Sequence, residues 1–121
     1  MFLRLYLDRR LYMFIKFDEF ELLELFEKEP IVIGDEAAGM FIYSKKDDQG
    51  FKLVLTLSIY EMQCGISLNY KNMGSSIFDL ELKDVGTIIG EDEKLKILSR
   101  NNEKIIELLF KPHFALQKIV L

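Results

Sequence analysis

The residues best suited to catalysis in this sequence are one histidine, His113, and one cysteine, Cys64. A nucleophilic triad needs a base beside its nucleophile and an acid that orients the base. Nothing in the spacing places Cys64 or a serine next to His113. His113 follows Pro112 in a predicted turn, and Cys64 stands next to Gly65 at the start of a predicted strand. We therefore expect a surface histidine, a buried thiol and no catalytic residues.

Metal and cofactor motifs are also missing from the sequence. No Cys/His cluster has zinc spacing, and neither glycine-rich phosphate loop occurs. The acidic turns at residues 47–50 and 91–93 lack the spacing of a calcium loop. Paired carboxylates could serve a glycosidase, but a small protein without tryptophan offers little sugar platform. The sequence predicts a non-enzymatic protein without metal or cofactor.

The negative charge of the chain is concentrated in one segment. The 121 residues carry a net charge of −4, while residues 18–36 alone hold eight acidic side chains against one lysine. Overall acidity argues against nucleic-acid binding, which depends on clustered positive charge. The segment is either a solvated face that keeps the protein soluble or a surface for a basic partner, because opposed potentials speed encounter.

A protein-binding surface is therefore the site that we predict. Tyrosine has an apolar ring and a polar tip, which suits interfaces, and Tyr60 stands on the polar side of a predicted strand. Core packing is the expected role of most phenylalanines. The predicted partner-binding residues are Glu19, Glu21, Glu24, Asp35, Glu36 and Tyr60.

The first residues combine apolar and basic side chains but do not form a targeting signal. A secretory signal needs an uninterrupted apolar run of roughly 7–15 residues, and Arg4, Asp8, Arg9 and Arg10 interrupt this stretch. No stretch reaches the ~18 apolar residues of a spanning helix. We expect no membrane contact and a cytoplasmic location. Two short strands could flank residues 8–10, or Met13 could be the native start and residues 1–12 a peripheral extension.

One helix is predicted, over residues 18–28. Its core is rich in Leu and Glu, which favour helices. Asp18 can accept hydrogen bonds from the first free amides, and Glu21 three residues later completes a capping-box pattern. Glu29 precedes Pro30 and is thereby pushed towards extended geometry, so the helix should stop by about Lys28.

The rest of the chain is predicted to be β-structure. From Phe51 to Ile59 every second residue is apolar, and the residues between them are polar except Val54, which is typical of a half-buried antiparallel strand. Turn residues recur every 8–12 positions, as in a meander. We expect one α+β domain over residues 1–121, an antiparallel β-meander of seven or eight strands with one helix on a sheet face or edge. The predicted strands are residues 40–44, 51–60, 65–71, 77–85, 87–89, 94–99, 104–110 and 114–120. The apolar residues of 104–110 also fit a helical period, so a helix is the alternative there.

The order of these segments resembles a known class of proteins. An acidic FDEFELLELFE is followed by AGMFIYS, GFKLVLTLSIYE, ISLNY, IFDLEL and FKPHFAL. Over residues 17–116 the chain is similar to small cytosolic immunity-type proteins encoded beside polymorphic or contact-dependent toxins of Gram-positive bacteria. The resemblance implies a non-enzymatic protein that binds one toxin domain and blocks it, and the acidic segment would suit a basic toxin domain. The alternative is a self-associating structural or accessory β domain, such as a homodimer, whose long strands pair at their edges.

Overall fold

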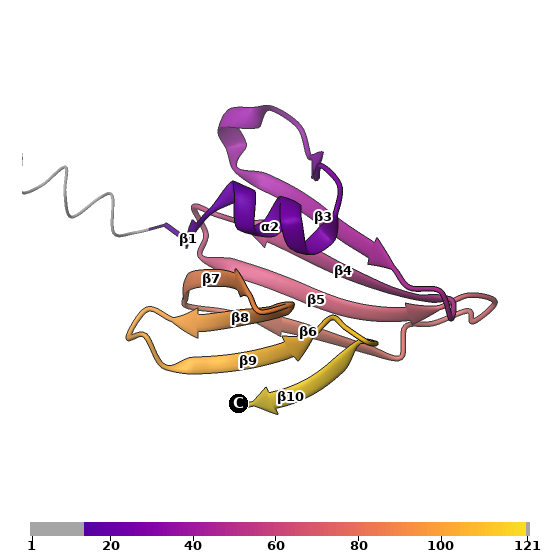
Figure 1. The fold of residues 1–121 in the computed structure, drawn as a ribbon. Coiled ribbons are helices and arrows are strands. Elements are labelled where there is room, and N and C mark those ends of the chain that lie inside the picture. The colour runs from indigo at the N-terminus through magenta and orange to yellow at the C-terminus, as the bar shows by residue number, and fades with distance from the viewer. Residues whose placement is uncertain (1–13, 121) are drawn as a thin grey trace, which may run out of the picture.

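The computed structural model describes residues 14–120 and shows two β-sheets with one α-helix (Figure 1). The first sheet consists of β2 (Ile31–Val32), β3 (Met40–Lys46), β4 (Phe51–Ser58), β5 (Gln63–Tyr70) and β6 (Phe78–Leu82), in that order. Every pair of neighbours in it is antiparallel and consecutive in sequence. Four of its strands, β3 to β6, belong to the predicted meander, whose remaining strands form a second sheet and not a continuation of the first.

The second sheet repeats this arrangement with one exception. It contains β1 (Lys16–Phe17), β7 (Val85–Glu91), β8 (Lys94–Ser99), β9 (Lys104–Leu109) and β10 (Ala115–Ile119), in the order β1-β7-β8-β9-β10. Strands β7 to β10 are antiparallel, whereas β1 lies parallel to β7 with Lys16 opposite Thr87. The pairing of β1 with β7 attaches the start of the described chain to the second sheet.

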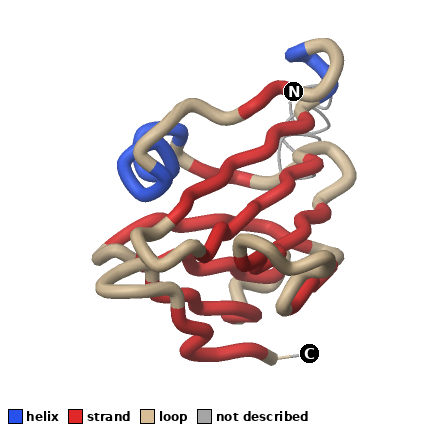
Figure 2. Tube along the Cα trace, turned by 90° about the vertical axis from the view of Figure 1, so that its right-hand side faces the viewer, coloured by secondary structure: helices blue, strands red, loops and turns tan. Residues whose placement is uncertain are grey.

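The core lies between the two sheets, which are stacked as layers (Figure 2). Side chains alternate along each strand, so every second residue of β4 and of β8 points into this space. Leu53, Leu55 and Leu57 from one sheet and Leu95 and Ile97 from the other are fully buried. The alternation that predicted a half-buried strand in β4 is confirmed.

The helix α2 (Glu19–Phe26) closes one side of the sandwich and packs mainly on β7, with fewer contacts to β3. Leu22, Leu25 and Phe26 are its buried residues. The Phe26 ring packs against Tyr43 of β3 at 5.3 Å between centroids and against Phe110 after β9 at 5.1 Å. The Phe26 side chain therefore packs against residues from both sides of the sandwich, Tyr43 in the first sheet and Phe110 just after a strand of the second.

Several boundaries differ from the sequence prediction. The described residues form ten strands, not seven or eight, because β1 and β2 have only two residues each and are too short to show alternation. The strand predicted over residues 77–85 is broken at Asp84, whose φ of 54° turns the chain from β6 into β7 and hence from one sheet to the other. The two strands predicted around residues 8–10 and the alternative start at Met13 concern residues outside the described part of the chain.

No helix in the described part of the chain has the length and apolar character needed to cross a membrane.

Candidate functional site

The six predicted partner-binding residues do not gather in one place. Glu19, Glu36 and Tyr60 line one groove, and Glu21 and Glu24 line a separate cleft. Asp35 is exposed and caps the short 3-10 helix η1 (Glu36–Ala38), where its Oδ1 accepts a hydrogen bond from the Ala37 amide at 3.2 Å. The helix α2 contributes to both depressions.

We call the first depression the Tyr60 groove. It has a volume of about 700 Å³ and a largely apolar lining. Tyr60 is 63% exposed and stands in the turn after β4, because β4 ends at Ser58 and not at Tyr60 as predicted. Its ring lies over Gly39, where an added Cβ would come within 2.8 Å of the ring, so the glycine leaves room for it. The remaining lining residues are Phe14, Ile15, Lys16, Phe17, Phe41 and Ile59.

The second depression, the hairpin cleft, lies between α2 and the turn that joins β7 to β8. It has a volume of about 460 Å³. Six carboxylates line it against two lysines, Lys45 and Lys111, together with Leu25, Gly90 and Phe110. The carboxylates belong to Glu21, Glu24, Glu27, Glu91, Asp92 and Glu93. The fold thus adds the acidic turn at residues 91–93 to the acidic helix.

Glu21 has a structural contact in this cleft. Its Oε1 accepts a hydrogen bond from the Gly90 amide at 3.1 Å, which ties α2 to β7. The predicted capping box is therefore wrong at Glu21, although Asp18 does cap the helix by accepting from the Phe20 amide at 2.8 Å. The capping box assigned Glu21 from sequence spacing alone, whereas the fold brings the Gly90 amide within reach of its carboxylate.

The turn between β7 and β8 holds its acidic residues in an unfavourable backbone conformation. Asp92 and Glu93 have φ of 53° and 58°, the left-handed values that a two-residue type I′ hairpin turn requires. Asn-Gly is the common choice there, and a side chain other than Gly, Asn or Asp costs roughly 1–2 kcal/mol at such values. Glu93 therefore occupies this turn although glutamate disfavours the left-handed backbone conformation.

Lysines neutralise part of the cleft. Lys45 contacts the Glu27 carboxylate at 2.5 Å and donates to the Leu25 carbonyl, while Lys96 pairs with Glu91 at 2.8 Å. The hydrogen bonds from these lysines lower the pKa of Glu27 and of Glu91. Glu24 has no ion-pair partner within residues 14–120 and is exposed. Asp92 in the β7–β8 turn also has no ion pair with a described residue, so unpaired negative charge remains on both α2 and the turn.

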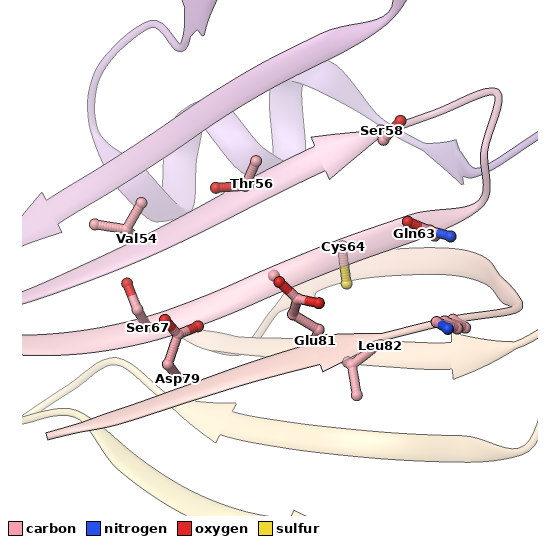
Figure 3. Close-up of a pocket in the computed structure, with 11 residues that line it drawn as sticks. Val54, Thr56, Ser58, Gln63, Cys64, Ser67, Asp79, Glu81 and Leu82 are labelled. Atoms are coloured by element: carbon pink, nitrogen blue, oxygen red, sulfur yellow. The ribbon is translucent and has the colours of Figure 1, made fainter. Parts of the chain in front are cut away.

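A third depression, the sheet-face hollow, lies on the outer face of the first sheet (Figure 3). It has a volume of about 320 Å³ and sits over β4, β5 and β6. Its lining is mostly small or polar: Val54, Thr56, Ser58, Gln63, Gly65, Ser67, Asp79, Glu81 and Lys83, with parts of Cys64 and Leu82. No predicted site residue belongs to it.

The two candidate catalytic side chains lie where the sequence predicts. His113 is exposed in the turn before β10, and Cys64 is buried at 5% exposure. Burial raises the pKa of the Cys64 thiol to about 12, so the thiolate is scarce at neutral pH. Within residues 14–120, no three His, Cys, Asp or Glu side chains are placed to hold a metal ion.

Comparisons with known proteins show a likeness of fold. No family model matches the sequence, and no curated protein matches it. Among solved structures, a chain of the contact-dependent growth inhibition toxin–immunity protein complex from Klebsiella pneumoniae 342 superposes with a TM-score of 0.68. The two are 19% identical, and the match covers 88% of this chain and 95% of the other. The fold is therefore one found in a toxin–immunity system. The match is to a Gram-negative bacterium, so the Gram-positive link stays a prediction.

Proposed function

We propose that this protein is an immunity protein that binds one toxin domain and neutralises it. The observation that carries the proposal is the fold, which matches a chain of a toxin–immunity complex over nearly the whole length of both chains. The order of segments in the sequence points to the same class independently of the structure. Neutralisation by binding requires a complementary surface and no chemistry of its own.

As part of this proposal, the protein is not an enzyme and acts in the cytoplasm. Its buried thiol and exposed histidine support a binding role, because neither has the partners that activate a nucleophile. The partner would be a protein domain, and positive charge on that domain would suit the acidic residues around α2.

The surface that we assign to binding is the exposed acidic face around α2. We call it the α2 acidic surface and define it by Glu19, Glu24 and Asp92, which make no ion pair with any residue the structure describes. Glu19 borders the Tyr60 groove, and Glu24 and Asp92 border the hairpin cleft. Opposed charges raise association rates more than they lower dissociation rates.

The direct test uses the toxin domain encoded beside this gene in the source genome. The two purified proteins should form a one-to-one complex by calorimetry, and co-expression of the present chain should restore growth of cells that produce the toxin. A toxin that neither binds the chain nor loses toxicity in its presence would refute the proposal.

To test the role of the α2 acidic surface, we use a charge-reversal variant that should keep the fold. Glu19→Lys with Glu24→Lys leaves the Glu21 contact to Gly90 intact. We expect slower association with the toxin, more so at low salt than at high salt. Glu103→Lys with Asp48→Lys, two exposed acids in the β8–β9 and β3–β4 turns, changes the net charge by the same amount and is the control. Equal rates for the double variant and the control would remove this surface from the proposal.

A further inference from the structure

Gly65 occupies the middle of the first sheet although the fold does not require a glycine there. It pairs with Thr56 of β4 on one side and with Glu81 of β6 on the other. An added Cβ would meet only the Leu80 carbonyl oxygen at 3.8 Å and the Thr56 Cβ at 3.9 Å, which are ordinary contacts. Glycine weakens a strand interior, and there it often marks a place that an external group approaches closely.

The residues around Gly65 leave its outer side open. Because strand residues alternate, Gly65 points away from the core while its neighbours Cys64 and Ile66 are buried. Thr56 and Glu81 flank it in one row, and Ser67 pairs with Asp79 in the next row (Figure 3). Thr56 and Ser67 on this face are half-buried and Glu81 is exposed. The helix α2 contacts β3 from the core side, through Tyr43. The glycine forms the floor of the sheet-face hollow.

The wall of the hollow on β6 carries negative charge. Asp79 and Glu81 are exposed and have no ion-pair partner in the described part of the chain. Lys83 is the one basic residue in the lining, so the carboxylates exceed it by one. The lining also contains hydroxyl groups, of which that of Thr56 bonds to no described residue. These groups accept hydrogen bonds from a cation.

We propose that the sheet-face hollow receives one lysine or arginine side chain of the toxin, with its aliphatic stem over Gly65 and its charged end between Asp79 and Glu81. This inference rests on the proposed function and adds a second contact surface to it. The volume of about 320 Å³ lies at the lower end of the range of roughly 300–1,000 Å³ for ligand pockets, which suits one side chain. Charged groups buried together at interfaces account for much of the specificity of such complexes.

Filling the hollow tests the proposal. Gly65→Val should keep or raise the thermal stability, because the added Cβ meets no close contact and valine favours strands. Affinity for the toxin should fall about tenfold or more, and Glu81→Gln should lower it by a similar factor. Gly74→Val is the matched control, because Gly74 lies in a loop where a Cβ would have nothing within 4 Å. Unchanged toxin affinity in both Gly65→Val and Glu81→Gln would overturn the proposal and leave the immunity function standing.

A second measurement does not need the toxin. The isotope-labelled protein is titrated with N-acetyl-arginine methylamide, and its neutral analogue N-acetyl-citrulline methylamide serves as the control. The proposal predicts amide shifts centred on Gly65, Thr56 and Glu81 with the arginine compound alone, and their loss in Glu81→Gln. Shifts spread evenly over all acidic residues, or no shifts at Gly65, would contradict it. Failure of the toxin to bind the native chain would instead refute the proposed function.

Discussion

Replacing Phe26 by alanine should loosen the whole side of the molecule that carries the α2 acidic surface. The ring is 2% exposed and touches Tyr43 of the first sheet and Phe110 beside the second. Removing it leaves a cavity where α2, β3 and the end of β9 meet. Large-to-small substitutions of buried phenylalanine cost about 3–5 kcal/mol.

That cost is large against the total stability of a domain, roughly 5–15 kcal/mol. With an unfolding entropy of about 2.1 cal/mol/K per residue, each kcal/mol lowers the melting temperature of this chain by about 4 °C. We therefore expect Phe26→Ala to lower it by roughly 12–20 °C in a thermal melt followed by circular dichroism. Urea unfolding should show the same loss as a lower midpoint with a similar slope.

Phe20→Ala is the matched control, since Phe20 lies on the same helix but is 79% exposed. Exposed substitutions usually change the free energy of unfolding by less than about 0.5 kcal/mol. A difference between the two variants below about 1 kcal/mol would show that α2 is not held by Phe26 and would refute the packing argument.

Three further predictions concern pH, the thiol and the edge of the first sheet. Lysine partners lower the folded-state pKa of Glu27 and of Glu91 below 4.5, so these ion pairs stabilise the fold above that pH and are lost as the pH falls through the folded-state pKa values. Melting temperatures measured from pH 7 to pH 3 should therefore drop, and they should drop less steeply in Lys96→Met, which lacks the partner of Glu91. Cys64 should resist thiol reagents in the native protein and react in urea, and rapid native labelling would contradict its burial. If the exposed edge strand β2 pairs with a second copy, sedimentation should show a concentration-dependent dimer that Ile31→Lys abolishes, whereas a strict monomer would remove the alternative of self-association.

Local pattern was enough to predict most of the fold. Nine of the ten strands pair with a strand next to them in sequence, and alternation and turn residues within a short window define all of these except the two-residue β2. The helix end was also predicted, since Glu27 adopts a φ of 61° just before the expected stop. The parallel pairing of β1 with β7 was missed, because it joins two-residue segments about 70 residues apart and leaves no periodic signal.

The candidate site was predictable only in part, for the same reason. The acidic helix and the acidic turn at residues 91–93 are both visible in the sequence, but only the fold brings Glu24 and Asp92 to one cleft. Glu21 was assigned to a helix cap, whereas its donor Gly90 is 69 positions away. The sheet-face hollow had one signal, Gly65 at the predicted start of a strand. Its meaning depended on knowing that β5 begins at Gln63 and which residues pair with Gly65.

The position of α2 has a consequence for the order in which a nascent chain can assemble. Strands β2 to β6 pair only with sequence neighbours, so the first sheet can form while the ribosome is still adding the second. The main packing surface of α2 is β7, which is made later, and the Gly90 donor for Glu21 arrives with it. We therefore expect the α2 acidic surface to form late in synthesis. A translation product that ends before residue 85 should form the sheet-face hollow but not the α2 acidic surface.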